Sequence, residues 1–363
     1  MGNVERLPAR SADRVAVLLN ANARSVSDTL KRELENFVPP EDLYYSRSFD
    51  DARSISRQVL DKGYRTVLTG GGDGTFVGYV NCLFDQAQQP RVDTALGAFK
   101  LVPVPVGEIL MPRFGVLKLG TGNAVADYVG ASGRRIGVVE DILRARSGEV
   151  SVARPLHLIL HDGKRAPFAG LGIDAAVLND YVSLKETVGP GGLGYFCSVV
   201  GKTLPSYLLQ RGIPQVEVLN LGGRAQQLGP DGKPVGREIE HGEVIYRGPC
   251  KIAAVSTVPN YGFGFRAFPH ALRAPGRFQL RLTAIGVPKV LTHLRTLWRG
   301  GPAPTGVLDF QCDKVSVRFD REMPLQVGGD AEGYRREVVF EMAERPLELL
   351  DFRARQSLSS ESM

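Results

Sequence analysis

The first half of the chain alternates apolar runs with stretches of helical periodicity. Within one of these stretches Ala52, Ile55 and Val59 fall on one face of a helix, and Gly63 would end it. Strands separated by helices and short turns are typical of a parallel sheet whose faces are covered by helices. The sequence therefore predicts an α/β domain over residues 12–149, with strands at Val15–Leu19, Leu43–Tyr45, Thr66–Leu68 and Val116–Leu119.

The pattern changes at about Val150. From there to residue 352, short apolar strands are separated by Gly/Pro turns, which predicts a mainly antiparallel β domain, a sandwich. We expect one helical stretch in it, Tyr195–Leu209, a last segment that can return to the first domain, and a disordered tail over 353–363. Residues 85–113 interrupt the α/β domain, and their prolines exclude a helix or a central strand, so an inserted loop or edge hairpin is expected.

Composition narrows the class of protein. Of 363 residues, 43% are hydrophobic and 23% charged, values typical of a soluble globular protein. The net charge of +6 permits an anionic ligand or a membrane surface without requiring either. Basic residues are not interleaved with aromatic ones, so no nucleic acid partner is predicted. The four cysteines lie far apart, which argues against zinc and against disulfides, and the absence of an apolar leader predicts a cytoplasmic protein.

A glycine-rich turn, GGGDGT, follows the strand at Thr66–Leu68 and opens a helix. Glycines let a phosphate chain approach the backbone, and N–H groups at a helix start favour an anion. Asp73, exposed to the cleft, would bind Mg²⁺ or orient phosphates, and Thr75 would donate a hydrogen bond. The alternative is an ordinary turn between strand and helix in which Asp73 only caps the helix.

A second turn, LGTGNA, has the same design after the strand at Val116–Leu119. In a parallel sheet both turns fall on the same edge, so Asp73, Thr121 and Asn123 are expected to face one crevice. Asn20 ends the first strand on that edge as well.

Four motifs in order, GGGDGT, LGTGN, GLGIDA and QVGGDAEG, resemble the signature of the diacylglycerol kinase and sphingosine kinase superfamily of lipid kinases. The resemblance extends from about Arg14 to Arg353. It implies an N-terminal domain similar to phosphofructokinase and NAD kinase, followed by a β-sandwich. It also implies that ATP binds between the domains and that its γ-phosphate passes to a lipid hydroxyl.

The resemblance assigns residues to the nucleotide. The segment NANAR is similar to the family's adenine-side turn, which implies Asn20 and, more weakly, Asn22, while Ser46 stands where the family has a threonine. The nucleotide would also contact Gly71, Gly72, Asp73, Gly74, Thr75, Thr121, Gly122 and Asn123.

The later motifs imply the remaining roles. Glu332 is the implied general base, Asp330 and Asp73 would bind Mg²⁺ or position groups, and Asp174 would contact the substrate hydroxyl or cap a turn. ATP and Mg²⁺ are the implied cofactors. The implied partner is a lipid at a membrane surface, with peripheral membrane association, and a homodimer is compatible with the sequence.

Two positions depart from the family pattern. Ala124 replaces the acid that follows GTGN in diacylglycerol kinases, a change closer to sphingosine and ceramide kinases, and Asp127 would compensate one turn further on. Pro275 replaces the aspartate of the Asp-Gly pair that is part of a structural metal site in some bacterial members of the family. That metal is therefore not predicted. A soluble kinase of the NAD-kinase type and a non-catalytic nucleotide- or lipid-binding homologue stay open as alternatives.

Overall fold

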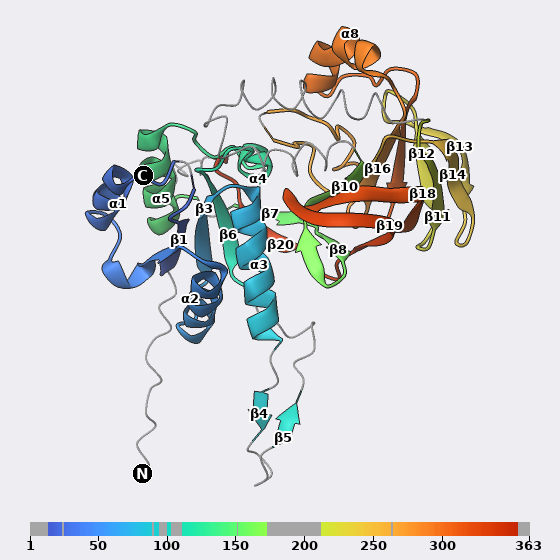
Figure 1. Ribbon diagram of the computed structural model, residues 1–363. Coiled ribbons are helices and arrows are strands. Elements are labelled where there is room, and N and C mark those ends of the chain that lie inside the picture. Colours follow the sequence, from blue (N-terminus) through green and yellow to red (C-terminus); the bar gives the residue numbers. More distant parts are fainter. Residues whose placement is uncertain are drawn as a thin grey trace, which may run out of the picture. The chain divides into compact units, whose positions relative to one another are not determined.

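The computed structural model describes residues 14–23, 25–88, 91–93, 100–102, 111–150, 152–172, 212–262 and 264–354. The chain divides into two compact units (Figure 1). The first unit is Met1–Pro155 together with Leu347–Met363, and the second is Leu156–Pro346.

The first unit contains a six-stranded sheet in the order β2-β1-β3-β6-β20-β7. Neighbours from β2 to β20 pair in parallel, which confirms the predicted α/β class. β20 brings a segment from the far end of the chain back into this sheet beside β6. The strands are β1 Val15–Asn20, β2 Leu43–Ser46, β3 Thr66–Gly71, β6 Arg113–Lys118, β7 Ala153–Leu156 and β20 Leu347–Leu350.

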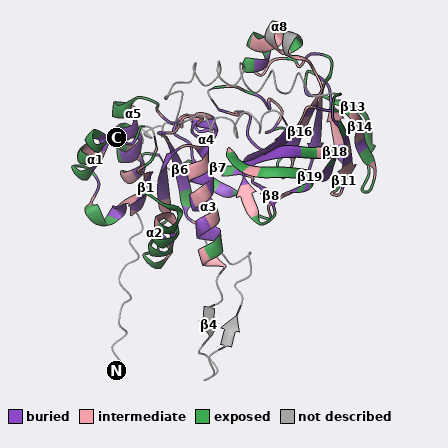
Figure 2. Ribbon diagram, in the orientation of Figure 1, coloured by how far each residue is buried: buried purple, intermediate pink, exposed green. Residues whose placement is uncertain are grey.

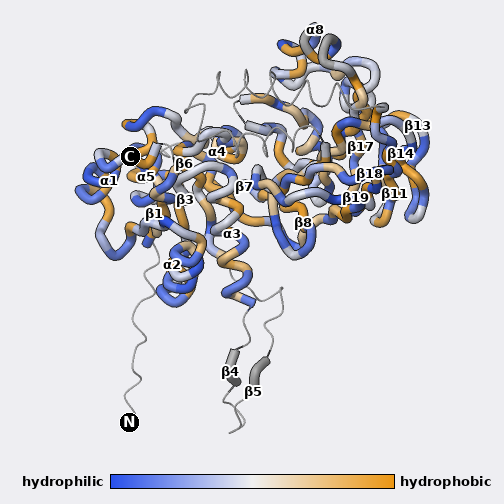
Figure 3. Tube along the Cα trace, viewed as in Figure 1, coloured by the Kyte–Doolittle hydropathy of each residue, from blue (hydrophilic) through white to orange (hydrophobic). Residues whose placement is uncertain are grey.

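Helices cover the sheet of this unit. The predicted helix over residues 49–63 is α2, which begins at a capping box between Ser48 and Asp51 and buries Ile55 and Val59. Figure 2 shows buried strands and exposed outer faces on α1 and α2, and the same helices are hydrophilic in Figure 3. The helices are α1 Asp28–Glu35, η1 Pro40–Asp42, α2 Phe49–Asp61, α3 Asp73–Ala87, α4 Ala124–Tyr128 and α5 Arg135–Arg146.

The core of the first unit forms where α3 packs on the sheet. Phe76 of α3 meets Phe114 of β6 edge to face at 5.7 Å between ring centroids, and both rings are fully buried. This contact fixes the start of α3, and with it the turn that precedes the helix.

The interrupting segment begins later than expected, because α3 continues to Ala87. Within it, β4 Arg91–Asp93 and β5 Lys100–Val102 pair antiparallel. The hairpin interpretation is therefore confirmed for these strands, while residues 89–90, 94–99 and 103–110 lie outside the described residues.

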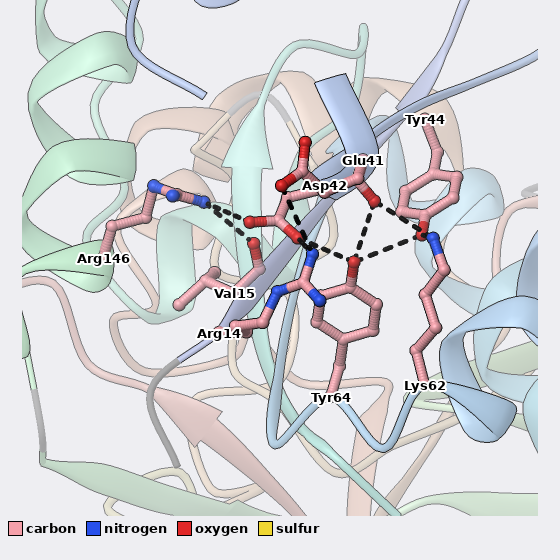
Figure 4. Close-up of polar contacts among 8 residues, drawn as sticks. All are labelled: Arg14, Val15, Glu41, Asp42, Tyr44, Lys62, Tyr64 and Arg146. Atoms are coloured by element: carbon pink, nitrogen blue, oxygen red, sulfur yellow. Dashed lines mark hydrogen bonds and ion pairs between the residues drawn. The ribbon is translucent and has the colours of Figure 1, made fainter. Parts of the chain in front are cut away.

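A charged network closes the amino-terminal edge of the sheet (Figure 4). At its centre is Asp42, which is 2% exposed and ends η1 just before β2. Arg14, before β1, forms an ion pair with it, Arg146 of α5 donates to its other oxygen over 3.3 Å, and the Tyr64 hydroxyl donates over 2.7 Å. Burial, with Asp42 nearby, raises the pKa of Tyr64 well above its ordinary value. Nothing in the sequence predicted this network.

The second unit is antiparallel β, as predicted. Its strands pair continuously in one sheet because the long strand β18 pairs with β11 in its first half and with β10 at its end. The strands are β8 Ile159–His161, β9 Lys164–Ala166, β10 Phe168–Gly172, β11 Gln215–Asn220, β12 Ala225–Leu228, β13 Pro234–Ile239, β14 Val244–Pro249, β15 Ile252–Ser256, β16 Phe278–Thr283, β17 Val307–Cys312, β18 Lys314–Val327 and β19 Asp330–Met342.

One helix of this unit, α8 Val287–Trp298, was not predicted. The sequence signal for its start is Pro288 in the first turn. Proline is favoured there because an N–H at this position would have no partner within the helix. The helical stretch that was predicted, Tyr195–Leu209, and most of the predicted tail lie outside the described residues. No helix in the described part of the chain is long and apolar enough to cross a membrane.

Candidate functional site

The strand order of the first unit marks a binding edge. β1 lies between β2 and β3, so the chain leaves β1 first to one side and later returns on its other side. In open parallel sheets, ligands bind beyond the carboxyl ends of the strands at such a switch point. Three predicted residues, Asn20, Ser46 and Gly71, end β1, β2 and β3 there.

The two glycine-rich turns lie in direct backbone contact at this edge. A Cβ on Gly120 would come within 2.1 Å of the Cα of Gly72, and a Cβ on Gly71 would come within 2.3 Å of Thr75 Oγ1. Glycine is therefore required at Gly120 and Gly71 by packing alone. Gly72 and Gly74, in contrast, are only half-buried, and their backbone is available to a ligand.

Asp73 joins the two turns. Its two carboxylate oxygens accept hydrogen bonds from the backbone N–H groups of Ala124 and Val125, over 2.8 and 2.9 Å, at the start of α4. The side chain is 8% exposed, so our expectation that it is exposed to the cleft was wrong. Burial raises the pKa of Asp73 although both N–H donors lower it, and the charge of Asp127 raises it further. It forms no ion pair with any described residue.

Asn123 shapes the second turn. It adopts the left-handed conformation, with φ 57°, which asparagine tolerates better than most residues. Its side chain accepts from the N–H of Gly120 over 2.9 Å and donates to the same residue's carbonyl over 2.6 Å. Asn123 is thus buried in the turn, while Thr121 and Gly122 are half-buried at the surface.

Asn20 links the first strand to the first turn. Its amide donates to Thr75 Oγ1 over 3.0 Å, and its carbonyl oxygen accepts from the backbone N–H of Asn22 over 2.9 Å. The backbone carbonyl of Ser46 accepts from the N–H of Ala21 over 2.8 Å. The residues predicted near the nucleotide in the first unit therefore form one connected group.

Asp127 does not stand free as a substitute for the acid missing at Ala124. It forms an ion pair with Lys118, the last residue of β6, and its backbone carbonyl accepts from Arg353. Lys118 is a cationic residue at this edge that we did not predict from the sequence. It could have been noticed because it lies directly before the LGTGN motif.

The predicted late-motif carboxylates lie in the second unit, on a tight hairpin. Gly328 and Gly329 have φ values of 64° and 87°, which allow the two-residue turn between β18 and β19. Just after it, Asp330 and Glu332 both bind Lys164, at 3.1 and 2.5 Å from its Nζ.

Lys164, from β9, gave no signal in the sequence, because its partners are far away along the chain. Burial would lower the pKa of Lys164, but the hydrogen bond with Glu332 and the two negative charges outweigh burial and raise it. Lys164 and Glu332 line a cavity together with His161, Asp162, Leu325, Val327 and Arg335. The hairpin therefore presents the partly exposed carboxylate of Glu332 beside a cationic side chain.

Two predictions stay as predictions at this point. Asp174 lies outside the described residues. No group of three or more His, Cys, Asp or Glu side chains within the described ranges is arranged to hold a metal ion.

Comparison with known proteins agrees with this arrangement. Residues 14–154 match the family model of the diacylglycerol kinase catalytic domain. A diacylglycerol kinase from Bacillus anthracis has a similar fold, with a TM-score of 0.58 at 14% identity over 93% of this chain and 97% of that one. A putative diacylglycerol kinase from the same organism gives 0.57 at 15% identity over the same shares. No curated protein matches the chain.

The family match covers the whole carboxyl edge described above, from β1 through both glycine-rich turns. The fold match covers 93% of this chain and so extends over both units. Residues 14–154 are therefore similar to the diacylglycerol kinase catalytic domain family, and the likeness to the solved structures extends to the fold of the chain.

Proposed function

We propose that this chain is a lipid kinase that transfers the γ-phosphate of ATP, with Mg²⁺, to a primary hydroxyl of a lipid at a membrane surface. The observation that carries the proposal is the contact between the two glycine-rich turns at the switch point of the sheet. This contact brings together the starts of two helices, α3 and α4. The backbone beside these helix starts is only half-buried, at Gly72, Gly74, Thr121 and Gly122. Such N–H groups and helix dipoles favour phosphate.

We propose that a cation binds beside Asp73. The carboxylate is buried without an ion pair among the described residues, and each of its oxygens keeps a lone pair after accepting one N–H. Mg²⁺ bound by the nucleotide would offset charge on the transferring phosphoryl group. Asp73 would also hold the two turns at a fixed separation, and Asp330 would be a second carboxylate for the ion.

Glu332 is the proposed base. In transfer, the lipid hydroxyl loses its proton to the Glu332 carboxylate while its oxygen bonds to the γ-phosphorus, and ADP leaves. A general base contributes about 10²–10⁴-fold to such a rate. The hydrogen bond from Lys164 would hold the Glu332 carboxylate in place until the substrate hydroxyl takes the position of the Lys164 ammonium group.

The acceptor is the finer part of the proposal. Ala124, after GTGN, favours a sphingoid base or ceramide over diacylglycerol, and Asp174 would contact its hydroxyl. The test is transfer from labelled ATP to vesicles that contain diacylglycerol, ceramide or sphingosine, with NAD as a soluble acceptor. Label in one lipid is expected. Label in NAD would support a soluble kinase, and no label in any acceptor would support a non-catalytic homologue.

Glu332→Gln tests the base. The amide keeps the size of the side chain but cannot take a proton, so kcat should fall about 100-fold or more while ATP binding stays unchanged. The matched variant Asp330→Asn lies two residues away on the same hairpin and contacts the same Lys164. If Asp330→Asn removes turnover and Glu332→Gln does not, Asp330 is the base.

A further inference from the structure

Positive charge is concentrated in one part of the second unit. Residues 244–308 contain nine Lys and Arg residues and no Asp or Glu, so this stretch carries +9 in a chain whose net charge is +6. The rest of the chain is therefore slightly acidic. Such an asymmetry indicates a surface for an anionic partner.

Within this stretch, α8 presents a basic face. Lys289, Arg295 and Arg299 are exposed, and they alternate with the exposed Thr292 and Thr296 at spacings that place all five on one side of the helix. Leu297 is buried on the other side. The exposed side of α8 therefore has three cationic groups and no apolar core contact.

Arg266 and Trp298 extend this face. The backbone N–H of Arg266 donates to the carbonyl of Trp298 over 3.0 Å, and Arg266 is exposed. The Trp298 ring stacks on Phe265 at 5.4 Å and stays 37% exposed. We call Arg266, Lys289, Arg295, Trp298 and Arg299 the α8 face.

Several basic residues elsewhere in this unit are neutralised by acidic partners. On the β11–β14 strands, for example, Arg237 pairs with Glu243 at 2.7 Å and Arg224 pairs with Glu238 at 3.0 Å. Within the described residues, the α8 face has no ion pair, and Lys289 only donates to the Thr305 carbonyl over 2.6 Å. Its charge is therefore available to a partner.

We propose that the α8 face docks the protein on an anionic lipid bilayer. This inference rests on the proposed function, because a lipid kinase must reach its acceptor in a membrane. Each Lys or Arg near an anionic leaflet adds about fivefold to the affinity, the equivalent of ~1 kcal/mol. A half-exposed tryptophan with an apolar ring and a polar N–H suits the level of the headgroups. Figure 1 places α8 outside the sheet of its unit.

The test uses the full chain and two kinds of vesicle, phosphatidylcholine alone and equal parts phosphatidylcholine and phosphatidylserine. Binding to the anionic vesicles only is expected, and it should weaken as salt shortens the screening length. Trp298 is the sole tryptophan of the chain, so its emission reports on this face directly. A blue shift, with quenching by brominated acyl chains, is expected on binding. Binding without any change in Trp298 emission would overturn the inference.

Matched variants separate this face from overall charge. The triple change Arg266→Gln, Arg295→Gln and Arg299→Gln should weaken binding about 100-fold. The triple change Arg224→Gln, Arg237→Gln and Arg247→Gln removes the same net charge from ion-paired positions and should have little effect. Equal losses in the two variants, or stronger binding to a DNA duplex than to vesicles, would refute docking on a membrane.

Failure of the kinase proposal would look different. Phosphorylation of a lipid dispersed in neutral detergent needs no anionic surface, so the α8 variant should keep that activity. If no acceptor is phosphorylated while vesicle binding still depends on the α8 face, the docking surface stands and the kinase assignment falls.

Discussion

The two edges of the parallel sheet use polar groups in opposite ways. At the amino edge, charged side chains surround Asp42 and each is paired. At the carboxyl edge, most polar groups are backbone or uncharged, and the buried carboxylate of Asp73 has N–H donors but no cationic partner in the described part of the chain. The comparison teaches that a closed network serves stability, whereas an edge with spare backbone donors is suited to a ligand.

The largest effect is expected from a substitution in the charged network at the amino edge. Asp42→Asn leaves Arg14 and Arg146 without their buried partner, so the free energy of unfolding should fall by about 3–5 kcal/mol. Urea unfolding followed by circular dichroism measures it. Glu41→Gln, whose side chain is 61% exposed, is the neighbouring control and should cost less than about 1 kcal/mol. Turnover per folded molecule should not change, and a loss would show that the two edges are not separate in role.

Asp73→Asn tests the carboxyl edge. Loss of the charge should lower kcat/KM about 100-fold or more, as removal of a group that stabilises transferring charge does. Because an amide nitrogen cannot accept one of the two N–H bonds, stability should also fall, by about 1.5–3 kcal/mol. Labelled phosphate transfer and urea unfolding measure both. Near-normal turnover would remove Asp73 from the site.

Gly120→Ala sharpens the role of the contact between turns. A methyl group 2.1 Å from the Cα of Gly72 must push the turns apart, which should lower the free energy of unfolding by about 1–3 kcal/mol and weaken ATP binding. Gly78→Ala, in the interior of α3 with nothing within 4 Å, should instead stabilise by about 1 kcal/mol. Calorimetry and ATP titration measure the pair. Equal behaviour of the two variants would contradict the packing role of Gly120.

The smallest effect is a pH dependence. Burial raises the pKa of Asp73 above the ordinary 3.8, so the stability contributed by its protonated form is complete below 3.8 and is lost as pH rises through the raised pKa. Asp73→Asn cannot titrate. Its stability deficit relative to the parent chain should therefore shrink between acidic and neutral pH, as unfolding at several pH values would show.

The sequence was informative where structure is local. The helix over Phe49–Asp61 was predicted because its cap and its apolar face lie within a few residues of each other. The strand β1 was predicted because it is a continuous apolar run, and the structure buries all of its residues except the last. The switch-point group was predicted because motif order fixes which strand ends carry which residues.

What the sequence could not show depends on register and distant pairing. Gly120 meets Gly72 only because β3 and β6 pair with a particular register, which puts Gly71 beside Lys118. Lys164 meets Glu332, and Arg14 meets Asp42, across long stretches of chain that no periodicity links. Asn123 was predicted as a ligand residue, and its hydrogen bonds to its own turn appear only in three dimensions.

The position of β20 has a consequence for biosynthesis. Leu347, Leu349 and Leu350 are buried in the first unit, and Phe352 donates to the backbone carbonyl of Val129 there over 3.0 Å. During translation, domains tend to fold as they emerge, but this one cannot complete its sheet until the whole second unit has left the ribosome. A nascent chain stopped before Leu347 would expose the unpaired edge of β6, so the first unit matures only at the end of synthesis.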